Sequence, residues 1–232
     1  MRNKPSTTTF YCFSPFVMAM TFIIELFLVL LVLLRHRRTK VVKLSVTVLL
    51  ALAAFQLAEY GVCEDLGLSG TTWATFGFAA ITLLPVLGLH LVYVIAKKLN
   101  KRVLTIAYAS AAVWVGLFLF GGIMESTVCN GNYVIFNLTE GFGGSYFIYY
   151  YFWLLVGTFV AVYHAMSSPV HTKRALLSHT IGYAMFIIPA TFIWIRYEGA
   201  AQGLPSIMCG FAVLYAILLA LVVVPNATKA EK

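Results

Sequence analysis

The stretch FVMAMTFIIELFLVLLVLL, residues Phe16–Leu34, decides the fold. Of its 19 residues only Glu25 is charged. A bilayer core about 30 Å thick is crossed by about 20 helical residues that rise about 1.5 Å each. The pattern therefore predicts a membrane-spanning helix, because strands of a membrane barrel would alternate apolar and polar residues over about 10 positions.

Six further stretches have the same length and character. Over the whole chain 61% of the residues are hydrophobic and 10% are charged. A soluble domain has about 25% charged residues, so the composition excludes a soluble enzyme and a disordered chain. We predict an all-α, polytopic membrane protein, a seven-transmembrane-helix bundle. Its predicted spans are Phe16–Leu34, Leu44–Gly61, Trp73–Ala96, Val103–Met124, Ser145–Met166, Ala175–Ile195 and Leu204–Val224.

The spans define one membrane domain, residues 16–224, between an N-terminal tail of residues 1–15 and a C-terminal tail of residues 225–232. Pro85 and Pro189 fall inside the third and sixth spans, where proline should kink a helix and free a carbonyl group. Pro225 should end the last helix.

Basic residues decide the predicted orientation. Thirteen of the 16 Lys and Arg residues lie after the first, third and fifth spans or in the C-terminal tail. By the positive-inside rule the N-terminus is outside and the C-terminus cytoplasmic, in what we expect to be the plasma membrane. The lipid bilayer is thus the predicted partner. Nucleic-acid binding is a poor explanation of the net charge of +8, since the basic residues lie in short loops against a membrane.

Aromatic residues are dense in Tyr146–Trp153, where five of eight positions are Tyr or Trp. This stretch begins the fifth span at the predicted outer interface. We interpret it as an aromatic belt that lies at the level of the lipid headgroups.

All four cysteines fall on the outer side or in the outer half of the membrane, where disulfides can form. A bond between Cys63 and Cys129 would join two outer loops, and one between Cys12 and Cys209 would join the first helix to the last. Four cysteines allow three pairings, and the sequence does not choose among them. Free thiols and metal ligation are the alternatives.

All five histidines fall on the inner side of the predicted topology. Three of them share a similar depth and could bind a metal ion, but no two have ligand spacing on one helix. We therefore interpret them as hydrogen-bonded residues near the inner interface. The five are His36, His90, His164, His171 and His179.

Two acidic residues lie within predicted spans. Glu25 is at the middle of the first span, where an isolated carboxylate costs several kcal/mol, so it should face the bundle and carry a proton. Glu59 follows Gln56 by three residues, which places both on one helix face. Such residues mark functional sites in membranes by default; a hydrogen-bonded clamp between helices is the alternative.

A polar pocket is predicted if the first, second and seventh helices are neighbours. Ser14, Gln56, Glu59 and Ser206 would then converge near the outer face, with Glu25 as a further ligand-binding candidate. Thiols would join them, so that Cys12, Glu59 and Cys209 could bind a soft metal ion. A disulfide beside a polar ligand cleft is the other interpretation.

The same residues resemble an uncharacterised prokaryotic family of seven-helix membrane proteins that open with a Cys-Phe-Ser motif. The similar segments are Cys12-Phe13-Ser14, FQLAEYG at Phe55–Gly61 and SIMCGFA at Ser206–Ala212. The family pattern has Gln in place of Phe55, Trp in place of Met208, and its glycine one position earlier. No activity is assigned to that family, so the resemblance supports the pocket and names no reaction.

A fainter similarity involves LPVLGLH at Leu84–His90 in the third span. Together with seven helices and an outer N-terminus, it looks like the seven-helix sensor region of bacterial histidine kinases. That resemblance implies a sensor whose output is carried by a separate partner, since only eight residues follow Val224.

Several functions are excluded by residue placement. A retinal-binding protein needs a lysine at mid-membrane, and none is present in the seventh span. A Ser–His–Asp triad would need Asp65, on the outer side, to meet histidines on the inner side. No phosphate loop, CxxC pair or HExxH motif occurs, which favours a protein that is not an enzyme.

Three functions stay open. The first is a ligand-binding sensor, or an assembly subunit with protein partners in a membrane complex. The second is a metal- or redox-active protein that uses Cys12, Gln56, Glu59 and Cys209. The third is a small ion or solute transporter that uses Glu25, because acids and broken helices recur on ion paths.

Overall fold

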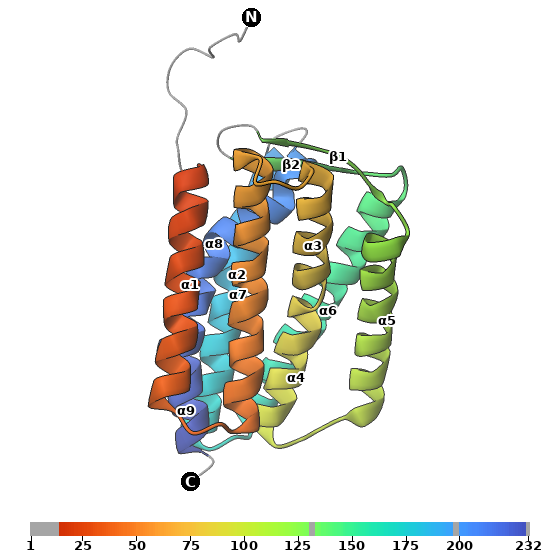
Figure 1. The fold of residues 1–232 in the computed structure, drawn as a ribbon. Helices are drawn as coiled ribbons and strands as arrows, with labels where there is room; N and C mark the ends of the chain where they lie inside the picture. The colour runs from red at the N-terminus through yellow and green to blue at the C-terminus, as the bar shows by residue number, and fades with distance from the viewer. Residues whose placement is uncertain (1–13, 130–132, 197–199, 231–232) are drawn as a thin grey trace, which may run out of the picture.

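A computed structural model describes residues 14–129, 133–196 and 200–230. The described residues are all-α in class, and 82% of them are helical. Within the described residues, seven helices are long and apolar enough to cross a membrane (Figure 1). This confirms the predicted helical bundle and indicates an integral membrane protein. The predicted tail residues 1–13 lie outside the described residues.

The first two helices form an antiparallel pair. Helix α1 (Pro15–Arg35) begins at a proline, whose missing N–H costs nothing in the first turn. Helix α2 (Lys40–Glu64) begins after Thr39, whose side chain accepts a hydrogen bond from the backbone N–H of Val42. It ends where Asp65 adopts a left-handed conformation with φ of 54°.

The third span consists of two helices, α3 (Gly70–Thr82) and α4 (Leu84–Ala96). Pro85 lies in the first turn of α4, directly after the break. A proline ring cannot donate to the preceding turn and clashes with it, so the helix restarts. The predicted proline disruption is confirmed in this span.

A β-hairpin follows α5 (Lys101–Phe120) and was not predicted. The predicted fourth span ran to Met124, but the helix ends at Phe120, before Gly121 and Gly122, and Gly122 has a φ of +62°. Strands β1 (Met124–Cys129) and β2 (Val134–Leu138) pair antiparallel across the end of the bundle.

Helices α6 (Phe142–Met166) and α7 (Val170–Arg196) form the next pair. Pro189 lies inside α7, which continues through it as one helix. The seventh span contains α8 (Leu204–Leu218), a π-helical turn η2 (Leu219–Val223) and α9 (Val224–Lys229). A 3-10 turn η1 (Ala200–Gly203) precedes α8.

The prediction that Pro225 ends the last helix is wrong, because α9 continues through Lys229. The turn before the proline is π-helical, and the N–H of Val224 bonds to the carbonyl group of Leu219, five residues earlier. This wider turn gives the proline ring room beside the preceding turn, so the helix is not broken.

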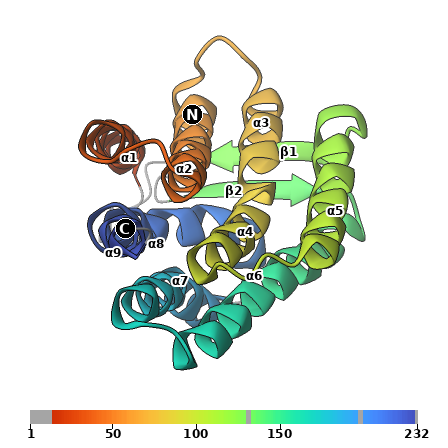
Figure 2. The same cartoon turned by 90° about the horizontal axis from the view of Figure 1, so that it is seen from below.

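Helix α4 is the most enclosed element, with α2, α5, α6 and α7 around it (Figure 2). Ten of its 13 residues are buried. Helix α1 packs against α2 and α8, and α2 also packs against α8. The three helices that carry the predicted pocket are therefore neighbours, as that prediction required.

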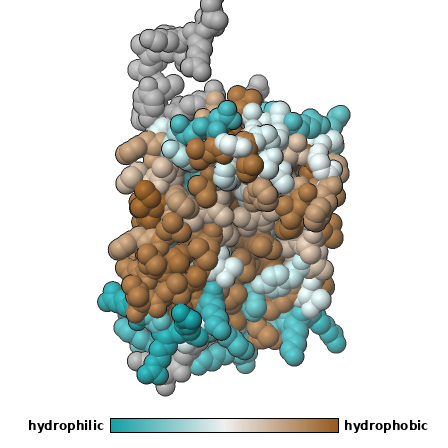
Figure 3. Space-filling model, in the orientation of Figure 1, coloured by the Kyte–Doolittle hydropathy of each residue, from teal (hydrophilic) through white to brown (hydrophobic). Residues whose placement is uncertain are grey.

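The surface divides into an apolar band and two polar ends (Figure 3). Phe16, Phe27 and Ile195 are among the large apolar side chains that are more than half exposed, as expected for lipid contact. We call the end that carries β1 and β2 the hairpin end. The opposite end, which holds the α1–α2, α4–α5 and α6–α7 connections and most of the basic residues, is the basic end.

One of the predicted disulfides is present. Cys63 at the end of α2 and Cys129 at the end of β1 are bonded, with their Cα atoms 5.2 Å apart. The bond ties the hairpin to the helical bundle at the hairpin end. The pairing that joins two connecting segments is therefore the one adopted.

Candidate functional site

Five buried polar side chains gather on three helices toward the hairpin end. Glu25 lies on α1, Gln56 and Glu59 on α2, and Ser206 and Cys209 on α8. We call this group the carboxyl cluster. Glu25 has an exposed fraction of 0% and Glu59 of 2%, so neither carboxyl group reaches water or lipid.

Three members of the cluster lie within electrostatic range of one another. The Glu25 and Glu59 carboxyl groups interact electrostatically, and the Cys209 thiol interacts with both. The Ser206 hydroxyl lies within side-chain hydrogen-bonding reach of Glu59. Its oxygen also accepts a hydrogen bond, 3.2 Å long, from the backbone N–H of Val134, so β2 is held against the cluster.

The structure thus brings together Glu59, Ser206 and Cys209 of the predicted pocket with Glu25, the further ligand-binding candidate. Ser14 lies at the N-cap of α1, where its side chain makes no cap hydrogen bond. Cys12 lies outside the described residues, so its predicted part in the pocket stays a prediction.

Four buried polar atoms of the cluster have no hydrogen-bond partner within the described parts of the chain. They are both carboxyl oxygens of Glu25, the Oε1 atom of Glu59 and the Nε2 atom of Gln56. In those same parts no Lys, Arg or His side chain forms an ion pair with either glutamate. A carboxyl group without partners costs several kcal/mol in a membrane interior. Within those parts, the hydrogen bonds of the cluster do not satisfy all of its polar atoms.

Helix geometry gives the depth of the two carboxyl groups. Glu25 comes ten residues after Pro15, and Glu59 comes five residues before Glu64. At about 1.5 Å per residue, they lie about 15 Å and about 8 Å from the hairpin-end termini of their helices. The cluster therefore runs from near the hairpin end toward the middle of the membrane.

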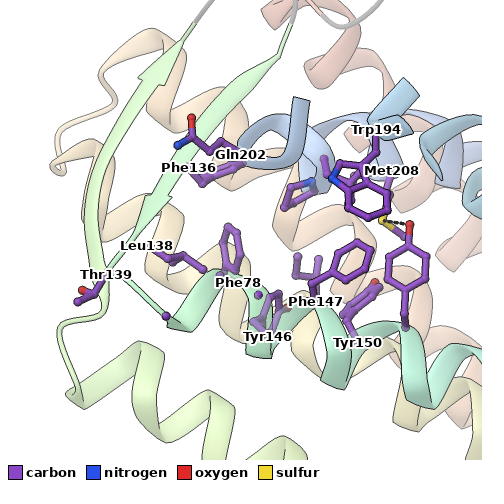
Figure 4. A pocket seen from close by; sticks show the side chains of 18 of the residues that line it. Phe78, Phe136, Leu138, Thr139, Tyr146, Phe147, Tyr150, Trp194, Gln202 and Met208 are labelled. Atoms are coloured by element: carbon purple, nitrogen blue, oxygen red, sulfur yellow. Dashed lines mark hydrogen bonds between the residues drawn. The ribbon is translucent and has the colours of Figure 1, made fainter. Parts of the chain in front are cut away.

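A cavity of about 410 Å³ lies next to the cluster. Seven of its 19 lining residues are aromatic and come from α3, β2, α6 and α7 (Figure 4). Cys209 borders it and is also a member of the carboxyl cluster, so the cavity and the cluster share one side chain. The aromatic wall consists of Phe78, Phe136, Tyr146, Phe147, Tyr150, Tyr151 and Trp194.

The mouth of the cavity lies where α6 begins. Gly141, at the N-cap of α6, has no side chain that could cap the helix. Gly143 and Gly144, in the first turn, both line the cavity. Glu140 and Gln202 are exposed at the same rim. The first amides of a helix carry no intrahelical partner, so this rim offers hydrogen-bond donors beside an apolar interior.

Two tyrosines of α6 close the break in the third span. The Tyr149 hydroxyl donates to the carbonyl oxygen of Thr82 at 2.8 Å, and the Tyr146 hydroxyl lies 3.1 Å from the Thr82 hydroxyl. The Thr82 hydroxyl also donates to the carbonyl oxygen of Phe78 at 2.6 Å. We call Thr82, Tyr146 and Tyr149 the tyrosine clamp.

The interpretation of Tyr146–Trp153 as an interfacial belt is wrong for four of its five Tyr and Trp residues. Tyr146, Tyr149, Tyr150 and Trp153 have exposed fractions of 6 to 9% and face the interior. Their spacing of three, four and seven residues from Tyr146 places them on one helix face. That spacing was the signal that could have identified them as cavity-forming residues.

The histidines lie apart from the carboxyl cluster. His90 Nδ1 is 2.9 Å from the Tyr108 hydroxyl, and His179 Nδ1 is 3.1 Å from the Tyr215 hydroxyl. The predicted hydrogen-bonded role is confirmed for these two. His179 is fully buried, so it belongs to the core of the bundle rather than to an interface.

The predicted metal ligands are only partly described. Cys209 carries a free, buried thiol, and it adjoins Glu59, but Cys12 lies outside the described residues. In the described parts of the chain, no three His, Cys, Asp or Glu side chains come together as a metal site would require. A bond between Cys12 and Cys209 likewise stays a prediction.

Comparison with known proteins assigns no family. No protein-family model matches the chain, and no curated protein matches it in sequence. The resemblances noted from short motifs therefore stay expectations, and the function must be argued from the cavity and the carboxyl cluster.

Proposed function

We propose that this protein is a membrane-embedded ligand-binding protein of the sensor type. Its ligand would be a lipophilic small molecule with a hydrogen-bond-accepting head group, bound in the cavity at the hairpin end. The observation that carries the proposal is the cavity itself, which has aromatic walls and a polar rim. Small-molecule sites are concave, mostly apolar and about 300–1,000 Å³ in volume, with a few polar groups that orient the ligand.

The wall and the rim favour different parts of such a ligand. Phe147 and Tyr151 stack with ring centroids 4.2 Å apart, and Trp194 lies 5.1 Å from Phe147, so the apolar body would contact a continuous aromatic surface. The uncapped first turn of α6 supplies N–H donors for the head group. The Tyr151 hydroxyl already donates a hydrogen bond to the sulfur of Met208, 3.9 Å away.

The orientation belongs to this proposal as well. Twelve described basic residues lie at the basic end or on α9, and the positive-inside rule would put that end in the cytoplasm. The cavity would then open on the extracytoplasmic side, where the Cys63–Cys129 disulfide can persist. We propose that signalling to the cytoplasm uses a partner protein at the basic end.

Fluorescence quenching tests the proposal. A bromine-labelled decanoate should quench Trp194, because its chain would lie against that ring, and Trp194→Phe should remove most of the quenching. Trp73→Phe is the matched control, since Trp73 packs on Gly61 outside the cavity wall. Equal quenching in the wild type and in Trp194→Phe would contradict the proposed site.

A cavity-filling variant gives a second test. A side chain at Gly144 would meet no atom within 4 Å of its Cβ, so Gly144→Leu should fold and occupy the mouth. We expect at least about a tenfold loss of decanoate affinity, which is about 1.4 kcal/mol. Gly116→Leu on α5, also free of neighbours within 4 Å, is the control. Unchanged affinity in Gly144→Leu would favour an assembly subunit instead.

A further inference from the structure

The carboxyl cluster contains buried polar atoms for which the described residues supply no hydrogen-bond partner. Three buried oxygen acceptors, two of Glu25 and one of Glu59, and one buried donor, Nε2 of Gln56, have no partner. Polar groups inside a membrane protein are almost always satisfied internally or by ordered water. The unpartnered atoms therefore point to a small bound species.

The chemistry of these atoms limits what that species is. Two carboxyl groups and a neighbouring hydroxyl form an oxygen-rich site, which suits a hard cation rather than a soft one. Calcium takes about six to eight oxygen ligands, more than these side chains offer. The amide N–H of Gln56 needs an acceptor, and a water molecule on the cation would provide one.

We infer that Glu25, Gln56, Glu59 and Ser206 form a binding site for one hydrated monovalent cation, either a proton or sodium. The positive charge neutralises one carboxylate of the pair, because two adjacent carboxyl groups in a low-dielectric interior do not both ionise without it. The inference does not depend on a ligand in the cavity.

Few titratable side chains interact with the carboxyl groups of Glu25 and Glu59. Among the described residues, the titratable side chains that interact with them are each other and Cys209 of α8. Cys209 also borders the cavity, which is open at the hairpin end. Cation binding and ligand binding would therefore share one side chain.

The test is thermal unfolding of the purified full-length protein in lipid nanodiscs, with choline as the inert replacement for sodium. If sodium binds, raising sodium at constant pH to about 100 times its dissociation constant should raise the unfolding midpoint by about 5 °C. If the cation is a proton, the midpoint in sodium-free buffer should rise as the pH is lowered from about 9 to about 6. Each dependence should be absent from the double variant Glu25→Gln/Glu59→Gln.

Glu64→Gln is the matched control, because Glu64 lies on the same helix but is exposed, and it should keep the wild-type response. Should the double variant fail to fold, the carbonyl stretch of protonated carboxyl groups in the infrared spectrum of the wild type is the second readout. That band should weaken when sodium binds or when the pH rises. A midpoint and a band that respond to neither cation, or a response retained in the double variant, would overturn the inference.

Discussion

The tyrosine clamp and the carboxyl cluster are both buried polar groups of one helical bundle, yet they differ in hydrogen bonding. In the clamp, each hydroxyl and the Thr82 carbonyl oxygen has a partner at 3.1 Å or less. In the cluster, four side-chain atoms have none among the described residues. The tyrosine clamp forms hydrogen bonds with the polar groups of Thr82 at the helix break before Pro85, so all of its groups are paired. The four cluster atoms are not paired within the described residues, and a bound species would account for them.

Thr82→Val should produce the largest effect, since it removes the hydroxyl at the centre of the clamp but keeps the side-chain shape. It leaves the buried Tyr146 hydroxyl without its partner, and we expect a loss of about 2–3 kcal/mol in the free energy of unfolding. Detergent titration followed by circular dichroism measures it. Thr105→Val, an exposed threonine bonded to its own helix, should change stability by less than about 0.5 kcal/mol.

A loss below about 0.5 kcal/mol for Thr82→Val would mean that water replaces the missing partner. The tyrosine clamp would then not be needed to close the broken span. Its internal hydrogen bonds would no longer distinguish it from the carboxyl cluster.

Glu25→Leu tests the carboxyl cluster. Its effect on the free energy of unfolding should be opposite in sign to that of Thr82→Val. Replacing an unpartnered buried carboxyl group with an apolar side chain of similar size should stabilise the protein by about 1–2 kcal/mol in sodium-free buffer near pH 8. The same detergent titration measures it. A loss of stability would show that Glu25 has partners and acts as a clamp.

The fold was predictable where the physical constraint was simple. Seven apolar stretches, each long enough for a bilayer, are sufficient to identify seven spanning helices, and the proline at position 85 locates a break. The hairpin was missed because β1 contains Glu125 and Ser126, and its strands are too short to differ clearly from a loop. The path of α9 through Pro225 depends on a π-helical turn, which leaves no mark in composition.

The candidate site was predictable only in part, for a reason that lies in its geometry. Helical spacing relates residues of one helix, so Gln56 and Glu59 could be paired from the sequence. That Glu25 faces them, and that Cys209 also borders a cavity, depends on how α1, α2 and α8 pack. Packing between distant segments cannot be obtained from the period of a single helix.

His36 allows the smallest prediction, and it separates two pH dependences. It follows α1 at the basic end, where its Nδ1 atom lies 3.5 Å from the Thr228 hydroxyl. Partial burial, and to a smaller extent the neighbouring Arg35, lowers its pKa. The unfolded chain therefore takes up a proton near about pH 6.5 before the folded protein does, so stability should fall as the pH drops below that value.

A proton on the carboxyl cluster acts in the opposite direction, because it stabilises the folded protein as the pH falls. The wild type should thus show two opposed contributions in a plot of unfolding midpoint against pH. His36→Gln should reduce the decline on the acid side and keep the rise that comes from the cluster, whereas Glu25→Gln/Glu59→Gln should remove that rise and keep the decline. If His36→Gln leaves the acid side unchanged, the decline arises from another group and His36 is protonated equally in both states.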